Sequence, residues 1–171
     1  MLFDVAGQGA VRVVVNHHAQ LSQEFSLPLQ ETSPVIFTDA GTGNGQSGIF
    51  QTPRTSGNPV TVNSPSNPVE KGGAIVFFAT GVGLWNQDLD TGQILFAGGQ
   101  LPALIVPKAE VSLKIDGISA KIFYVGAANG RTGVIQVNAF VPEAASAGIV
   151  SLELVIGNHS NAAQNVTLAI Q

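Results

Sequence analysis

The 171-residue sequence contains no cysteine. Disulfide bonds, thiol catalysis and cysteine-ligated zinc or iron–sulfur sites are therefore excluded. Charged residues are scarce too, at 11% of the chain against about 25% in an average globular protein. The seven basic residues are scattered between Arg12 and Arg131, and the net charge is −4. A nucleic-acid-binding surface needs clustered positive charge, so we expect no nucleic-acid partner.

The sequence also lacks a membrane span and a signal peptide. No apolar run approaches the roughly 20 residues that cross a bilayer, and the opening MLFDVAGQ has neither a basic nor an apolar region. Ser, Thr, Asn and Gln dominate the polar residues, with 20 Gly and 9 Pro between them. An uncharged polar surface favours an extracellular or cell-surface location. We expect the export signal upstream of this fragment.

Apolar residues follow the period of β-strands in short segments separated by Gly, Asn and Pro. These segments are residues 11–15, 24–29, 74–80, 110–116, 120–125, 133–140, 151–156 and 165–170. The pattern predicts an all-β sandwich, since no window has the spacing and caps of a stable helix. Residues 142–148 could form one helical turn.

Three local features carry more detailed predictions. The continuous apolar run at residues 74–80 predicts a central strand buried on both sides. The pair Asp116-Gly117 predicts a tight turn, with residues 120–125 completing a hairpin. The segments 39–59 and 84–102 are poor in strand signal, so we expect long surface loops there.

The two ends of the sequence resemble each other. Residues 6–30 align with residues 147–171 without a gap, at an offset of 141. His18 falls on His159, and apolar residues fall on apolar residues, as in two copies of one structural unit. The matched apolar pairs are Val11 with Leu152, Val13 with Leu154, Val14 with Val155, Val15 with Ile156, Phe25 with Val166, Leu27 with Leu168 and Leu29 with Ile170.

Only the last two strands of this unit occur twice. We therefore predict that residues 1–30 are the terminal hairpin of a truncated upstream repeat and that residues 31–171 form one sandwich domain. An isolated hairpin is marginal in water, so these strands should pack on residues 31–171 or pair with another molecule. A homodimer made by strand exchange of residues 1–30 is one such arrangement.

Five segments carry a family resemblance. Residues 32–37 (TSPVIF) and 62–68 (VNSPSNP) are similar to the motifs A-A-P-G-I-F and L-N-S-P-S-N-P-A. Residues 71–83 (KGGAIVFFATGVG) resemble G-x-x-V-x-x-Y-A-T-G-L-G. Residues 118–128 (ISAKIFYVGAA) resemble V-P-A-x-V-x-Y-A-G-x-A, and residues 133–142 (GVIQVNAFVP) resemble G-L-Y-Q-V-N-V-x-V-P.

These motifs belong to the uncharacterised C-terminal domain found on many large exported acidobacterial (Solibacter-type) proteins. The resemblance covers the whole chain and implies tandem immunoglobulin-like (Ig-like) repeats of the TIG kind. It implies a place at the end of secreted or surface proteins, and it implies no activity. The sequence departs from the family at residues 123–125, where small residues often follow the tyrosine, and in the missing upstream half.

Two residue groups could bind a metal. His17, His18 and His159 are possible ligands, but the repeat makes His18 and His159 equivalent positions of two units, and a site needs three or four converging ligands. Asp88 and Asp90 have the alternating carboxylates of a calcium loop, although Gly99 stands where its closing Glu would be. A solvated turn is the favoured interpretation, and weak calcium binding stays open.

The sequence favours a protein without catalysis. The Gly-rich residues 41–48 precede IFQTP rather than a helix, so they predict a loop and not a phosphate cradle. The chain has no Gly-x-Ser-x-Gly elbow, and we expect no cofactor. A triad assembled from distant loops keeps a hydrolase as a third hypothesis.

Trp85 is the only tryptophan and separates the two leading hypotheses. The first is a structural, adhesion or assembly module of a larger secreted or cell-surface protein, with protein or polysaccharide partners and no membrane insertion. The alternative is a carbohydrate-binding module that stacks sugar rings on Trp85 beside long polar loops. An exposed Trp85 would favour the second, and core packing is the simpler interpretation.

Overall fold

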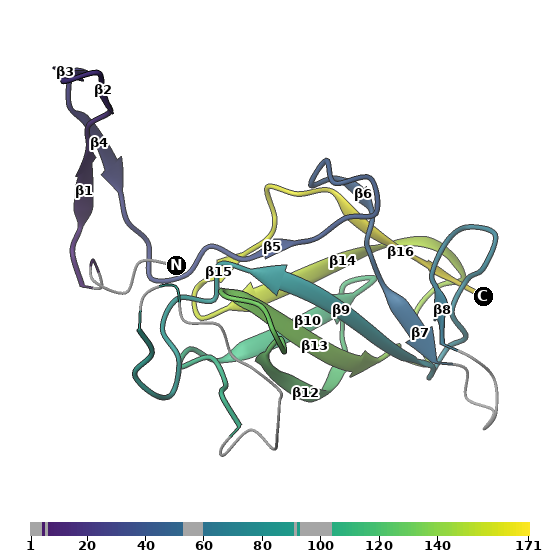
Figure 1. The fold of residues 1–171 in the computed structure, drawn as a ribbon. Helices are drawn as coiled ribbons and strands as arrows, with labels where there is room; N and C mark the ends of the chain where they lie inside the picture. The colour runs from purple at the N-terminus through teal and green to yellow at the C-terminus, as the bar shows by residue number, and fades with distance from the viewer. Residues whose placement is uncertain (1–4, 6, 53–59, 91, 93–103) are drawn as a thin grey trace.

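The computed structural model describes residues 5, 7–52, 60–90, 92 and 104–171. These residues form two packed β-sheets and a separate hairpin that extends away from them (Figure 1). Sheet I and sheet II each have six strands. The chain is thus an all-β protein with a sandwich-like body.

Sheet I contains the C-terminal strands. Its order is β11 (Ile118–Ser119), β10 (Val111–Ile115), β14 (Gly148–Ile156), β16 (Val166–Ile170) and β6 (Gly45–Gln46), with β15 (His159–Ser160) paired to β14. Sheet II has the order β12 (Lys121–Ala127), β13 (Val134–Phe140), β9 (Ala74–Thr80), β7 (Phe50–Thr52) and β8 (Thr61–Val62), with β5 (Val35–Ile36) paired to β9.

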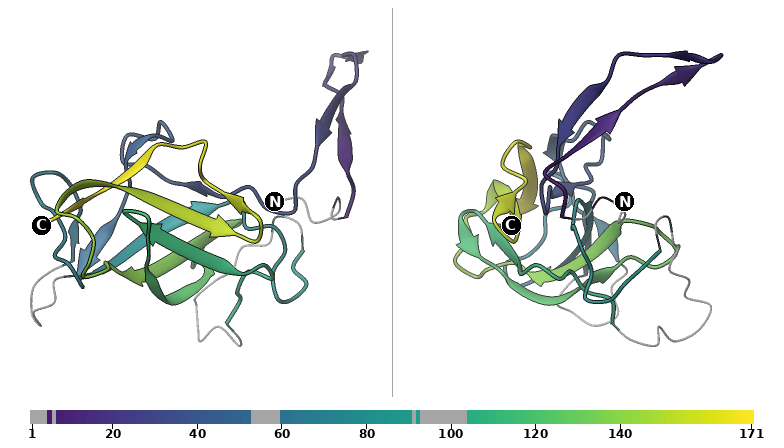
Figure 2. Two further views of the ribbon diagram at one scale, coloured as in Figure 1. Left: turned by 180° about the vertical axis from the view of Figure 1, so that it is seen from behind. Right: turned by 90° about the vertical axis from the view of Figure 1, so that its left-hand side faces the viewer.

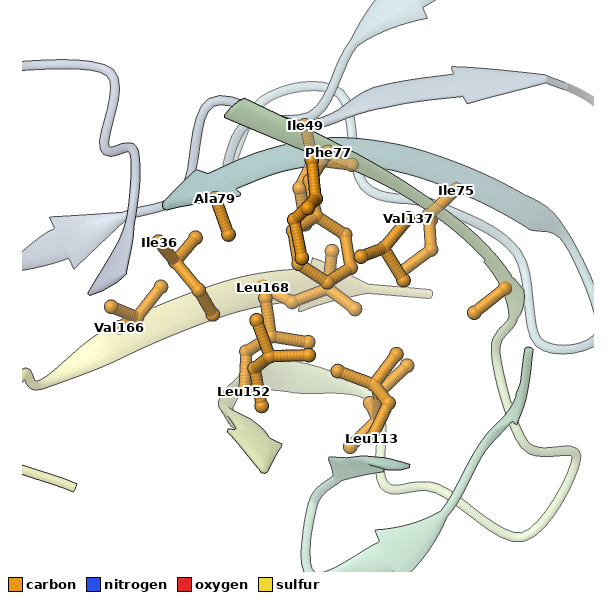
Figure 3. Packing of buried hydrophobic residues seen from close by; sticks show 14 of the residues in the cluster. Ile36, Ile49, Ile75, Phe77, Ala79, Leu113, Val137, Leu152, Val166 and Leu168 are labelled. Carbon is orange, nitrogen blue, oxygen red and sulfur yellow. The ribbon is translucent and has the colours of Figure 1, made fainter. Parts of the chain in front are cut away.

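The core lies between the two sheets because alternate side chains of each strand point inward. Ile75, Phe77 and Ala79 of β9 are fully buried, as is Leu168 of β16. Figure 3 shows Phe77 pointing from sheet II toward Leu168 of sheet I. Other buried members of this core include Ile36, Ile49, Leu113, Val137, Leu152 and Val166. The apolar alternation in the sequence is therefore the pattern of the two inner faces.

Two predictions about β9 and the turn at residue 116 need correction. Strand β9 is buried on one face only, because its outward residues, such as Phe78, are only half-buried. Asp116 and Gly117 do form a tight turn, with φ of 56° and 72° and with Ile115 paired to Ile118. However, the partner across the turn is β11. After Ser119 the chain crosses to sheet II, where β12 pairs with β13.

The predicted loop at residues 39–59 also contains two strands. Gly45 and Gln46 form β6, and Phe50–Thr52 forms β7. Ser47 lies between them, and both its backbone N–H and its hydroxyl donate to the Thr167 carbonyl of β16, at 3.0 Å and 2.7 Å. These strands are short and depend on bonds to distant residues, so they lack a local alternating signal. Residues 53–59 lie outside the described part of the chain.

A buried amide connects the sheets at one end of the sandwich. Asn63 is 1% exposed, and its side-chain N–H groups donate to Gln51 Oε1 of β7 and to the Ala169 carbonyl of β16, both at 2.8 Å. Its Oδ1 accepts from the Ala169 backbone N–H at 3.0 Å and from Gln46 Nε2 at 2.6 Å. One side chain therefore satisfies polar groups of both sheets where water is excluded.

We expect Asn63→Ala to lower the free energy of unfolding by about 2–4 kcal/mol, because it leaves buried polar groups unsatisfied. Urea unfolding followed by the fluorescence of Trp85, which is buried, measures this change. The control is Gln87→Ala at an exposed amide, which should alter stability by less than about 0.5 kcal/mol. Equal effects of the two substitutions would contradict the role given to Asn63.

Candidate functional site

The feature that stands apart from the sandwich is a hairpin arm, defined here as residues 8–30. It consists of β1 (Ala10–Val13) paired with β4 (Phe25–Pro28), and of the short strands β2 (Asn16–His17) and β3 (Gln20–Leu21) at its tip. Figures 1 and 2 show the arm projecting away from both sheets. Among the described residues, the arm's hydrogen bonds stay within residues 5–29.

The two faces of the arm differ in chemistry. Val11 pairs with Leu27, and Val13 pairs with Phe25, so these four side chains share one face. The opposite face carries Arg12 and Ser26, and Arg12 lies 3.7 Å from the Glu24 carboxylate. The exposed ion pair contributes little to stability. The apolar side chains define what we call the arm face.

The arm face is open to solvent. Phe25 is 64% exposed, and Val13 and Leu27 are exposed as well. Val15 and Leu21 extend the apolar character toward the tip. Lone surface hydrophobics are ordinary, but a two-stranded sheet with one wholly apolar face is marginal in water unless something covers that face. The arm is therefore the leading candidate for an interaction surface.

The internal repeat shows what such a face does elsewhere in the same chain. Residues 147–171, which align with the arm, form β14, β15 and β16 of sheet I. The apolar residues that align with Val11, Val13, Val15, Phe25, Leu27 and Leu29 of the arm are all buried against sheet II. They are Leu152, Leu154, Ile156, Val166, Leu168 and Ile170. The sequence signal for a core face is thus the same in both copies. Only the C-terminal copy has a facing sheet.

The structure tests one expectation about how the arm packs. The strands of residues 1–30 were expected to pack on residues 31–171 or to pair with another molecule. The described residues of β1 to β4 pair only with one another, so packing on the body is not observed. The prediction of a truncated upstream repeat, and of strand exchange between copies, stays a prediction.

The root of the arm is fixed tightly to the body. Thr32 is buried, and its hydroxyl donates to the Ile156 carbonyl at 2.7 Å and lies 3.0 Å from His159 Nδ1. The Ser33 backbone N–H donates to the Gly81 carbonyl at 2.8 Å. Gly81 and Gly83 have positive φ, and a Cβ on either would overlap a carbonyl oxygen of the root. Only glycine permits this close approach.

We expect Gly81→Ala to destabilise the protein by at least about 2 kcal/mol more than Gly92→Ala does. Both glycines have φ near 80°, but no atom of the described residues lies within 4 Å of the place where a Cβ on Gly92 would sit. Gly92→Ala therefore carries only the backbone strain of about 1–2 kcal/mol. Urea unfolding of the two variants separates strain from overlap. A similar loss in both would mean that the root yields to the methyl group.

Trp85 is not available for stacking. Its exposure is 6%, and it belongs to the core cluster, where it forms an isolated bridge with Pro107. Neighbouring backbone bonds join Asn86 N–H to the Val106 carbonyl and Lys108 N–H to the Leu84 carbonyl. Of the two interpretations that the sequence offers for Trp85, the structure matches core packing.

The possible metal ligands do not converge in the described residues. His17 and His18 stack edge-on at the arm tip, whereas His159 contacts Thr32 in the body. Asp88 and Asp90 are both exposed. Within the described part of the chain, no three His, Cys, Asp or Glu side chains form a group that could hold a metal. Calcium binding at Asp88 and Asp90 stays a prediction, since Gly99 and its neighbours lie outside the described residues.

Asp116 has a shifted pKa, and its carboxylate has a structural role. The backbone N–H of Ser146 donates to Asp116 Oδ2 at 2.9 Å, and this hydrogen bond lowers the pKa of the Asp116 carboxyl. The bond ties the β10–β11 turn to the segment that precedes β14.

The described residues contain no helix that is long and apolar enough to cross a membrane.

Sequence reasoning missed a second apolar area, on the outer face of sheet II. The rings of Phe123 and Phe140 lie 4.6 Å apart at 34°, and Phe50 meets Phe78 edge-on at 6.4 Å. Phe50, Phe123 and Phe140 are exposed. The signal was present, because Phe78 and Phe140 occupy the alternate, outward positions of β9 and β13.

Comparisons with known proteins found no counterpart. No protein-family model matches the chain, no curated protein matches it, and no solved structure matches it. The geometry of the arm and of the body is therefore the basis for the functional proposal.

Proposed function

We propose that this chain is a non-catalytic assembly module of a larger exported protein, built on an Ig-like sandwich, and that it associates with a partner protein through the arm face. The observation that carries the proposal is the arm face itself. An apolar face made of Val11, Val13, Phe25 and Leu27 matches the composition of a buried sheet face, yet here Val11 is only half-buried and the other three side chains are exposed to solvent.

The use of polar side chains in the body agrees with a structural role. Asn161 Oδ1 accepts the Leu154 N–H at 2.7 Å, and Gln164 bonds both the N–H and the carbonyl of Ile36. Asn63 and Ser47 likewise serve the backbone of β16. Asn161, Asn63 and Ser47 are buried and Gln164 is half-buried, and these amides and hydroxyls hold strands together. The uncharged polar composition supports export. The resemblance to exported acidobacterial repeats supports both export and the Ig-like assignment.

The carbohydrate-binding alternative loses the residue on which it depended. Trp85 is in the core. The exposed phenylalanines of sheet II do not replace it with a flat platform, because the Phe123 and Phe140 rings are tilted against each other. An assembly function through the arm remains the better-supported proposal.

We expect the purified chain to self-associate with rising concentration, because open arm faces have no other cover in solution. Phe25→Asp places a charge in the arm face and should give a monomer. Ser26→Asp adds the same charge on the opposite face and should leave association unchanged. Sedimentation equilibrium of the three proteins measures the effect.

A wild-type chain that stays monomeric at every concentration, with rapid amide exchange throughout the arm, would overturn the proposal. Equal loss of association in both variants would also count against it, since a general effect of charge would then explain the result. Circular dichroism and urea unfolding of the variants should match the wild type, because Phe25 lies outside the core.

A further inference from the structure

We propose that the occupant of the arm face is an incomplete β-sandwich of the same kind, to which the arm supplies the last two strands. This inference rests on the proposed function and names the partner: a sheet with an exposed apolar inner face, like sheet II without β14 and β16. The arm then forms part of the neighbouring unit, although its root belongs to this one.

The shape of the occupant follows from the internal repeat. In the body, the face equivalent to the arm face covers Phe77 and Ile75 of β9 and Val137 of β13. Two sheets pack face to face with interdigitating side chains, about 10 Å apart. The apolar positions of the arm repeat those of β14 and β16 in order. A surface that fits the arm face is therefore the inner face of a sheet like sheet II.

The edges of the arm point to the same occupant. In sheet I, β14 lies between β10 and β16, so both of its edges are hydrogen-bonded. Strand β1 pairs with β4 alone in the described residues. An unpaired edge favours addition to another sheet. A sandwich that lacks its last two strands offers both an apolar face and the free edge of a β10-like strand.

A complete second copy is a poorer partner, because it holds its own β16 with bonds that the arm does not reproduce. The Ala169 backbone N–H donates to Asn63 Oδ1 at 3.0 Å. The residue of the arm that aligns with Ala169 is Pro28, which has no N–H to donate. Asn161, which bonds the Leu154 N–H, aligns with Gln20. Exchange with an intact copy would break these bonds.

The register of the arm is compatible with docking. Strand β14 pairs Ser151 with Thr167, which align with Ala10 and Ser26, whereas the arm pairs Ala10 with Pro28. The two pairings differ by two residues. A shift by an even number keeps every side chain on its own face, so the arm face points inward in either register. His18 and Ala19, both at positive φ, form the tip turn of the free arm.

The test is a tandem protein that ends with residues 6–171, which hold the whole arm and the whole body. Because residue 6 aligns with residue 147, residues 31–146 can be joined directly to residues 6–171, with no linker. The first unit of this tandem lacks its own last two strands, and the arm follows it where they would be. We expect the amides of residues 10–13 and 25–27 to exchange at least about 100-fold more slowly than in the unfused chain. Both units should resist proteolysis.

Matched substitutions within the tandem make the result specific. Phe25→Asp should restore fast exchange in the arm and expose the first unit to protease, while the second unit stays folded as an internal control. Ser26→Asp should do neither. Arm exchange equal to that of the unfused chain, with digestion of the first unit, would overturn the inference.

The same protein separates this inference from the proposed function. If the arm completes the first unit, the tandem should lose the self-association of the unfused chain, because the arm face is covered. If the first unit stays unfolded while association still depends on Phe25, the arm is an assembly surface with another occupant. Association that is independent of Phe25 would count against both.

Discussion

The structure depends on the contact between two apolar sheet faces. Phe77 of β9 fills the space opposite Leu168 of β16, and neither residue is accessible to solvent. Each sheet is amphipathic, so each is stable only while the other covers it. The strands from residues 148 to 170 meet that condition, and the equivalent strands of the arm do not. The two similar sequences therefore differ in environment: one is covered by sheet II, and the other is left open on the arm.

Buried and half-buried polar side chains add specificity to that apolar contact. Asn63 reaches from sheet II to the backbone of β16, and Gln164 holds β5 through Ile36. Both amides bond to backbone groups that side-chain packing alone would leave unsatisfied. Hydrophobic alternation therefore specifies which face is buried, while these amides specify which strand occupies each place. Pro28 stands at the arm position equivalent to Ala169 and has no N–H, so the arm cannot make the hydrogen bond by which Asn63 holds β16.

The sequence predicted the strands whose apolar pattern, alternating or continuous, extends over six residues or more. Residues 74–80 form β9 as expected, and β13, β14 and β16 lie within a few residues of their predicted bounds. Strands β6 and β7 were missed because their partners are distant in sequence. The sheet change after Ser119 was missed because periodicity does not say which sheet a strand joins. The burial of Trp85 depends on contacts with residues more than twenty positions away, such as Pro107. The repeat identified the arm, but only the structure showed its face uncovered.

The tight root has a mechanical consequence. Thr32 and Ser33 are held against Ile156 and Gly81, so little freely rotating chain separates the arm from its own body. Modules joined by flexible linkers move independently of one another, and the distance between them fluctuates. Modules joined by an arm with a fixed root would instead hold a constant angle and spacing. A series of them would be a stiff rod that keeps its two ends at a set distance.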